Sequence, residues 1–194
     1  MIENGFHDVP PGKLAVVVTH LEMDAKPSLR EVPLPEGVTF RKVSPTPDWF
    51  RDIFRRVGMD WLWYGRLKLD DTALLQDPAR DFYTLTRDGK DEALLELNFP
   101  EDGSCELAYF GLTSALIGSG SGRYLMNQAI TLAWEKPITR LHLHTCTNDS
   151  PQALGFYVRS GFIPVRRQVE IDDDPRLTGL LPRDAAPQVP LIEA

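Results

Sequence analysis

The residues with the clearest chemical potential form a glycine-rich run that opens a predicted helix. Residues Gly118–Gly122 alternate glycine with serine, and Arg123 follows them. Glycines at a strand-to-helix turn let the backbone approach a ligand, and the free N–H groups at the helix start favour an anion. Arg123 adds a full positive charge. The run therefore predicts a loop that binds a phosphate or pyrophosphate group.

Two common phosphate loops do not fit this run. A nucleotide-hydrolysing P-loop needs Lys and then Ser or Thr after its last glycine, and here Arg123 and Tyr124 follow. A dinucleotide fingerprint needs Gly-x-Gly-x-x-Gly and an acidic residue at the end of the next strand, whereas that strand ends in Thr145-Cys146-Thr147. A glycine-rich connection without a ligand remains as the alternative.

A second motif follows the next predicted strand. Residues 148–157 are NDSPQALGFY, and residues 160–162 are SGF. In this order and spacing, the two motifs resemble the GNAT superfamily of acyl-CoA-dependent N-acetyltransferases over residues 106–162. That family has Gln/Arg-x-x-Gly-x-Gly/Ala in its phosphate loop and Asn-x-x-Ala-x-x-Phe-Tyr-x-x-x-Gly-Phe further on. Ile117 stands where the family has Gln or Arg, so backbone N–H groups must supply that contact.

The resemblance implies that acetyl-CoA is a co-substrate and that its acetyl group passes to an amine of a small molecule or peptide. The mechanism would be direct attack in a ternary complex, because no activated Cys or Ser is apparent. Tyr157 matches the acid that protonates the leaving thiolate. The implied cofactor-binding residues are Phe110, Gly111, Leu112, Gly118, Ser119, Gly120, Ser121, Gly122, Arg123 and Asn148.

The catalytic base is less clear from the sequence. Glu106 lies on the strand before the glycine run and could act directly or through water, but it could equally be an exposed strand carboxylate. Asp149 is a second candidate, although helix capping would be a sufficient structural role for it. Asn148 either contacts the cofactor arm or shapes a turn.

Two further features concern the cofactor arm and the acceptor. The family has a strand bulge at the position of Phe110-Gly111-Leu112, and Gly111 is consistent with a bulge or a close ligand approach. Trp61, Trp63 and Arg66 are candidates to line the acceptor site, with cation–π contact to an amine. The alternative is that these aromatic residues belong to the core.

His142 and His144 share one face of a predicted strand, so a metal pair must be considered. No third ligand stands at a suitable spacing, and we therefore predict no metal. The alternative, histidines on a sheet face under a helix, is preferred. Cys146 shares that face but lies in no motif that would make it a nucleophile.

The hydrophobic pattern predicts one mixed sheet with helices on its faces. Together with the resemblance, it implies a single GNAT-like α+β domain over residues 1–171, with a mixed, mostly antiparallel sheet flanked by helices. A proline-rich C-terminal tail follows over residues 172–194. The predicted strands are 13–19, 38–43, 82–86, 92–99, 105–112, 140–146 and 163–171. The predicted helices are one that begins near Pro47 and ends at Gly58, an aromatic segment over 61–69, one that begins near Gly120, and one that follows Asp149 and Ser150 and ends at Gly161.

Composition excludes several classes of protein. The 28 acidic and 21 basic residues among 194 give a net charge of −7, which argues against general nucleic-acid binding. No apolar run is long enough for a membrane helix, and no secretory signal is recognised. Two cysteines cannot form a disulfide framework, so we expect reduced thiols and a cytoplasmic protein.

Some alternatives stay open at this point. A non-catalytic acyl-CoA-binding sensor or interaction module with the same fold is the second functional hypothesis. A longer acyl donor would fit the same motifs. The tail could wrap a partner subunit, so a homodimer is kept beside the monomer.

Overall fold

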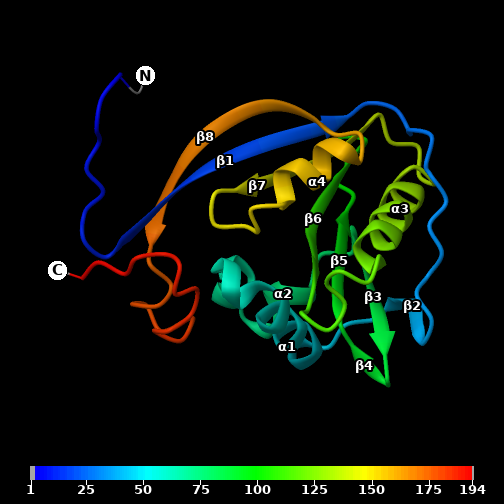
Figure 1. Ribbon diagram of the computed structural model, residues 1–194, viewed down its shortest axis with the longest axis horizontal. Helices are drawn as coiled ribbons and strands as arrows, with labels where there is room; N and C mark the ends of the chain where they lie inside the picture. The colour runs from blue at the N-terminus through cyan, green and yellow to red at the C-terminus, as the bar shows by residue number, and fades with distance from the viewer. Residues whose placement is uncertain (1–2, 194) are drawn as a thin grey trace.

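The computed structural model describes residues 3–193 and contains one mixed sheet (Figure 1). Its strands are β1 (Lys13–Met23), β2 (Val38–Val43), β3 (Arg80–Arg87), β4 (Lys90–Asp91), β5 (Ala93–Asn98), β6 (Ser104–Leu112), β7 (Arg140–Cys146) and β8 (Ile163–Asp173). Their order across the sheet is β2-β3-β5-β6-β7-β1-β8, with β4 paired to β3. β6 and β7 run parallel and the other paired strands antiparallel. The predicted α+β fold is confirmed.

Helices cover both faces of this sheet. They are α1 (Pro47–Gly58), α2 (Asp71–Leu75), α3 (Ser121–Ala133) and α4 (Ala153–Arg159), with short 3-10 turns at Met59–Trp61 and Gly65–Lys68. Side chains alternate across a strand. Leu95 of β5 therefore packs in the cluster under α3, while its neighbour Leu94 packs under α1. Among residues 3–193, no helix combines the length and apolar character needed to cross a membrane.

Both ends of α1 are as the sequence predicts. Thr46 accepts a hydrogen bond from the backbone N–H of Trp49 at 3.2 Å, and Pro47 opens the helix. Gly58 is the last residue of the helix, as expected. A Cβ on Gly58 would come within 2.5 Å of the Cβ of Trp63, so glycine is needed there for packing.

The segment after α1 differs from the prediction. Residues 61–69 were expected to form a helix, but the chain makes two 3-10 turns separated by Leu62 in the left-handed conformation, at φ 55°. Leu62 is buried against Leu181 and Ala185 from the C-terminal segment. Because this contact joins residues over 100 positions apart, local helical pattern could not predict it. We call residues 61–69 the acceptor loop, after the role that the sequence predicts for Trp61, Trp63 and Arg66.

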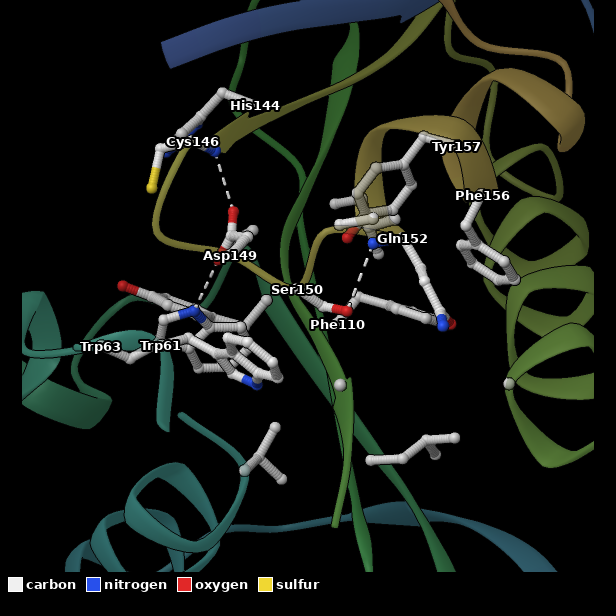
Figure 2. A pocket seen from close by; sticks show the side chains of 18 of the residues that line it. Trp61, Trp63, Phe110, His144, Cys146, Asp149, Ser150, Gln152, Phe156 and Tyr157 are labelled. Atoms are coloured by element: carbon white, nitrogen blue, oxygen red, sulfur yellow. Dashed lines mark hydrogen bonds between the residues drawn. The ribbon is translucent and has the colours of Figure 1, made fainter. Parts of the chain in front are cut away.

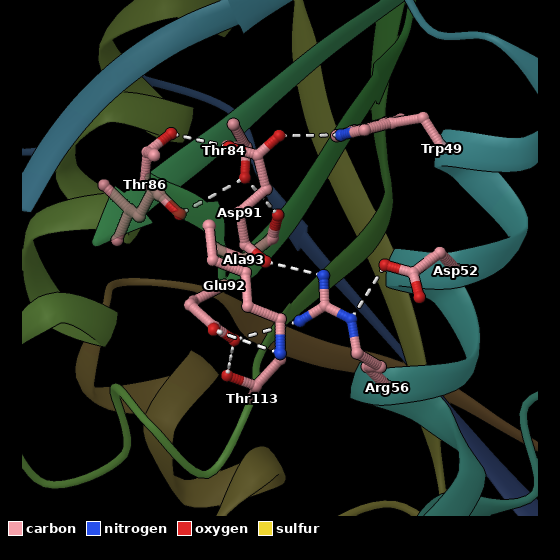
Figure 3. A network of polar contacts seen from close by, with 11 residues as sticks. Trp49, Asp52, Arg56, Thr84, Thr86, Asp91, Glu92, Ala93 and Thr113 are labelled. Carbon is pink, nitrogen blue, oxygen red and sulfur yellow. Dashed lines mark hydrogen bonds and ion pairs between the residues drawn. The ribbon is translucent and has the colours of Figure 1, made fainter. Parts of the chain in front are cut away.

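A polar network fixes α1 to the sheet and to Thr113, the residue that follows β6 (Figure 3). Arg56 of α1 donates to Asp52, to the Glu92 carboxylate at 3.0 Å and to the Asp91 carbonyl at 2.6 Å. Glu92 also accepts from the Thr113 hydroxyl, and the Thr113 N–H donates to the Glu92 carbonyl. The residue that follows β6 is therefore held in place from the far side of the sheet.

β1 lies in the middle of the C-terminal half of the sheet, between β7 and β8 (Figure 1). It pairs antiparallel with both, as in Thr19 with Thr145 and Arg167. β8 continues to Asp173, two residues into the predicted tail. The rest of the tail packs on its own chain, and the buried ion pair of Asp174 with Arg176 anchors it.

Candidate active site

The site lies where the two parallel strands separate. β6 and β7 pair only from Ser104 to Glu106 and from Arg140 to His142, and they diverge beyond those residues. A cavity of about 610 Å³ lies against the diverging ends, lined by residues 107–112 of β6 and by His144 and Cys146 of β7. In this opening the β7 side of β6 has no neighbouring strand, so an extended amide chain can pair with its backbone.

The β6 bulge falls at a different residue from the one expected. Leu107 pairs with Leu97 and Tyr109 with Glu96, so the extra residue is Ala108 and not Phe110 or Gly111. The need for glycine at position 111 has a different physical reason, which is packing. A Cβ there would come within 2.3 Å of the Val57 Cγ1, so this glycine lets α1 pack against β6.

The glycine loop, which we define as residues 118–122, borders the cavity through its three glycines. Gly118 and Gly120 have φ of 81° and 90°, where side chains are strained, and a Cβ at either position would meet nothing within 4 Å. Glycine is therefore required by the backbone conformation, while the space above it is open. Gly122 also lines the cavity, within the first turn of α3. The Ser119 and Ser121 hydroxyls are not among the lining groups and contact each other at 2.7 Å.

Two arginines border the same end of the cavity. Arg123 donates to the Ser160 hydroxyl at 2.9 Å, and its guanidinium lies 4.9 Å from the Phe156 ring centre. It thus ties α3 to α4 as well as facing the cavity. Arg159, in the last turn of α4, also lines the cavity. Arg159 is not among the predicted cofactor-binding residues, although a basic residue two positions after the Phe-Tyr pair was a usable signal.

Tyr157 projects from α4 into the cavity beside Phe110 (Figure 2). Its ring lies against Phe110, Phe156 and Phe162, at centroid distances of 5.8 to 6.3 Å. Burial raises the pKa of Tyr157 far above its usual value, and the nearby Asp149 carboxylate raises it further. The phenol is therefore protonated at neutral pH and can donate a proton.

Asp149 does not cap α4, contrary to expectation. Its carboxylate accepts from the Trp63 indole N–H at 3.0 Å, from the Thr145 hydroxyl at 2.6 Å and from the Cys146 N–H at 2.9 Å (Figure 2). Gln152 occupies the cap position of α4 without a side-chain hydrogen bond. Asp149 thus joins the acceptor loop to the end of β7, and its charge faces the cavity.

Glu106 is not among the cavity-lining residues, but it reaches one of them. Its Oε1 lies 3.9 Å from Nδ1 of His144, which lines the cavity and whose side chain is 51% exposed. His20 of β1 packs on the other side, with ring centres 5.8 Å apart. Within residues 3–193, no group of three or more histidine, cysteine or carboxylate side chains is arranged to hold a metal ion.

The acceptor loop supplies a different set of side chains from the predicted one. Trp61 and Trp63 line the cavity. Arg66 does not, because its guanidinium turns inward to the buried Glu96 at 2.5 Å. Lys68 lines the cavity instead and pairs with Asp172 at 2.7 Å.

Asn148 lies apart from the main cavity. It lines a smaller pocket of about 80 Å³ next to the acceptor loop. That pocket shares Trp61, Trp63 and Glu170 with the main cavity. Asn148 therefore lies beside residues 61–64 and not among the residues that line the main cavity.

Comparisons with known proteins agree with the geometry. Residues 45–162 match the model of the acetyltransferase (GNAT) family. A curated relative, the mycothiol acetyltransferase of Jonesia denitrificans, is 28% identical over 173 residues, which are 83% of this chain and 54% of the relative. The chain thus spans about half the length of that relative.

Solved structures show the same fold. A GCN5-related N-acetyltransferase from Sphaerobacter thermophilus superposes with a TM-score of 0.59 at 16% identity, covering 84% of this chain and 52% of that one. A second one, from Kribbella flavida, gives a TM-score of 0.57 at 21% identity, covering 87% and 63%.

Proposed function

This chain belongs to the GNAT acetyltransferase family, and we propose that it transfers an acetyl group from acetyl-CoA to an amine of a small molecule or peptide. The observation that carries the proposal is the cavity at the diverging ends of β6 and β7, which has the glycine loop and Tyr157 on its walls. These features match the needs of the reaction, which are an anion site, a free strand edge and a proton donor.

The chain offers each part of acetyl-CoA a matching surface. Gly118, Gly120 and the first turn of α3 would hold the pyrophosphate, with Arg123 and Arg159 as counter-charges. The free edge of residues 107–112 would pair with the amides of the pantetheine arm. A backbone N–H of that edge would then polarise the thioester carbonyl.

Gly120→Ala should weaken acetyl-CoA binding by about tenfold, because a left-handed conformation costs an L-residue roughly 1–2 kcal/mol and its relaxation moves the N–H groups of the loop. Gly179→Ala is the matched control. Gly179 also has a positive φ (77°) and open space around it, but it lies in the C-terminal segment. Calorimetric titration with CoA measures both variants. Equal affinities of the two variants would contradict the assignment of the loop.

The acceptor arrives as an ammonium ion and must lose a proton before it attacks. We assign this step to His144, whose Nδ1 faces Glu106. The ammonium gives its proton to the imidazole, and the amine lone pair then forms the C–N bond with the thioester carbon. The C–S bond breaks and Tyr157 gives its proton to the departing thiolate. The amide nitrogen passes its second proton to the Tyr157 phenolate, and His144 returns its proton to solvent.

A covalent acyl-enzyme is not part of this proposal. Cys146 lines the cavity. Burial raises the pKa of its thiol to about 11, and the Asp149 carboxylate adds to the rise. It is therefore the unreactive thiol form at neutral pH.

His144→Gln should lower kcat/KM by about 100-fold at neutral pH, because it removes the assigned proton acceptor. His142→Gln is the matched control, since His142 lies two residues away on the same face but outside the cavity. Glu106→Gln should lower kcat/KM less than His144→Gln does. If Glu106→Gln loses the rate while His144→Gln keeps the wild-type rate, Glu106 is the base and His144 is not.

The acceptor end of the cavity favours a cation. Asp149, Glu170 and Asp172 contribute carboxylates there, against Lys68 alone, and Trp61 and Trp63 offer aromatic faces. The relative from Jonesia denitrificans is named for mycothiol, so mycothiol-related small molecules join simple amines and peptides as acceptors to test.

An acceptor panel with release of free CoA thiol as the readout tests the function. We expect at least one amine to accelerate thiol release over the hydrolysis background. If CoA binds but no amine accelerates release, the chain is an acyl-CoA sensor and the transferase proposal is wrong. Longer acyl-CoA donors run in parallel decide the donor.

A further inference from the structure

The outer strand β8 is exposed over almost its whole length. Of its eleven residues only Asp172 is partly covered. Ile163, Val165, Val169 and Ile171 are 67%, 52%, 48% and 55% exposed. A long edge strand with exposed apolar side chains is normally covered, because it offers unpaired backbone groups to another strand.

The outward backbone groups of β8 can be identified from its pairing. The Asp174 N–H donates to the Gly12 carbonyl, and the same register continues from Asp173 with Lys13 to Arg166 with His20. Bonded and unbonded positions alternate along an antiparallel pair. The even-numbered residues therefore bond to β1, while Arg167, Val169 and Ile171 direct their N–H and C=O groups away from the sheet.

The usable edge has a defined end. The register with β1 shifts after His20, since Leu21 pairs with Pro164. Val165 is therefore the extra residue of a bulge, and Pro164 has no N–H to offer. A strand that adds to this edge must pair with residues from about 165 to 172.

We propose that a second copy of the chain pairs with this edge, β8 antiparallel to β8, with the two-fold axis at Gln168. In this register Arg166 faces the partner's Glu170, and Val165 faces the partner's Ile171, each twice. Within residues 3–193 neither Arg166 nor Glu170 has a salt bridge. The two-fold symmetry thus creates two opposite-charge pairs, between Arg166 and Glu170, and two apolar pairs, between Val165 and Ile171.

Neighbouring registers are less favourable. An axis at Arg167 would place this arginine opposite itself, and like charges directly opposite destabilise a sheet. An axis at Val169 would pair Arg166 with Asp172, whose carboxylate already accepts from Lys68 and Tyr64. The axis at Gln168 instead pairs two charges that have no salt bridge in the described part of the chain, although Arg166 contacts the His20 ring nitrogen at 3.4 Å.

The proposed dimer also reaches the acceptor end of the cavity. Glu170 is one of the cavity-lining carboxylates. Pairing with the partner's Arg166 would reduce the negative charge that a cationic acceptor meets there. The partner chain would thus contribute a charged side chain at the border of each site.

Single cysteines test the register. Gln168→Cys should form a covalent dimer on mild oxidation, because unbonded facing residues have Cα atoms about 4.5 Å apart, within disulfide range. Arg167→Cys and Val169→Cys should not, since neither faces itself. Cys105 is buried and Cys146 partly buried, and the wild type controls for both. Preferential cross-linking at 167 or 169 would overturn the pairing about Gln168.

Charge exchange tests the interface in solution. At about 100 µM, where an interface of micromolar Kd is assembled, sedimentation should show a wild-type dimer. Arg166→Glu and Glu170→Arg should each be monomeric with unchanged circular dichroism. A mixture of the two should restore a 1:1 dimer, because each pair then unites opposite charges, and the double variant should also dimerise. A monomeric wild type, or single variants that remain dimeric, would overturn the proposal.

Discussion

Tyr157→Phe should lower kcat by about 10²- to 10⁴-fold, the usual range for loss of a general acid, while CoA affinity stays unchanged. The ring of Tyr157 packs among Phe110, Phe156 and Phe162, and phenylalanine keeps those contacts. Only the hydroxyl is lost, so the fold and the donor site remain. Thiol release measures kcat, and calorimetry measures CoA binding.

The pH profile gives the same prediction a second readout. Burial disfavours the phenolate, so the folded-state pKa of Tyr157 lies above that of a free phenol. The protonated, acid-competent form therefore persists as pH rises, and Tyr157 should cause no loss of rate below about pH 10. A fall in rate below that pH that disappears in Tyr157→Phe would contradict the raised pKa.

Tyr124→Phe serves as the control for Tyr157→Phe. Tyr124 belongs to α3, is partly buried, and packs edge-on against Phe40 rather than lining the cavity. It should keep wild-type kcat. If Tyr157→Phe also keeps wild-type kcat, another group protonates the leaving thiolate.

Glu96→Gln should lower the free energy of unfolding by about 3–5 kcal/mol, the cost of removing one partner from a buried ion pair. The Glu96 side chain is 0% exposed and lies 2.5 Å from Arg66 and 3.6 Å from Arg80. Burial raises the pKa of its carboxyl, and the two arginines limit that rise. Without this carboxylate, Arg66 loses its counter-charge beside Tyr109 and Arg80 keeps only the pair with Asp77, at 3.7 Å. Urea denaturation measures the cost.

Asp71→Asn is the matched control for Glu96→Gln. Asp71 pairs with Arg51 at the same 2.5 Å, but its side chain is 72% exposed. Water screens such pairs, so the expected cost is about 0–1 kcal/mol. Glu96→Gln should also raise the acceptor KM, because Arg66 anchors the acceptor loop through Glu96. Equal stability losses in the two variants would show that the Glu96 cluster is not electrostatically coupled.

The parts of the site that depend on local geometry could be predicted from the sequence. Gly118 and Gly120 open a helix toward a cavity, and Tyr157 projects into it, because a short turn and one helical turn fix these positions. The same holds for the cap at Thr46. In each case the residues that decide the conformation lie within a few positions of one another.

Side-chain partners across the sheet could not be predicted in this way. Arg66 was expected at the acceptor and instead turns to Glu96, thirty residues along the chain. Asp149 was expected to cap a helix and instead binds Trp63 from the acceptor loop. In both cases a charged or hydrogen-bonding partner from a distant segment outweighs the local preference, since buried polar groups need partners.

The sequence by itself determined the strands, most of the helices and the position of the glycine loop, because hydrophobic period and turn chemistry are local properties. The tertiary structure alone decided that the N-terminal strand β1 lies between β7 and β8. It also decided that β8 therefore becomes the exposed edge. Strand order depends on pairing between residues more than 120 positions apart, as with Thr19 and Thr145. Local pattern shows that a strand forms but not which strand will be its neighbour.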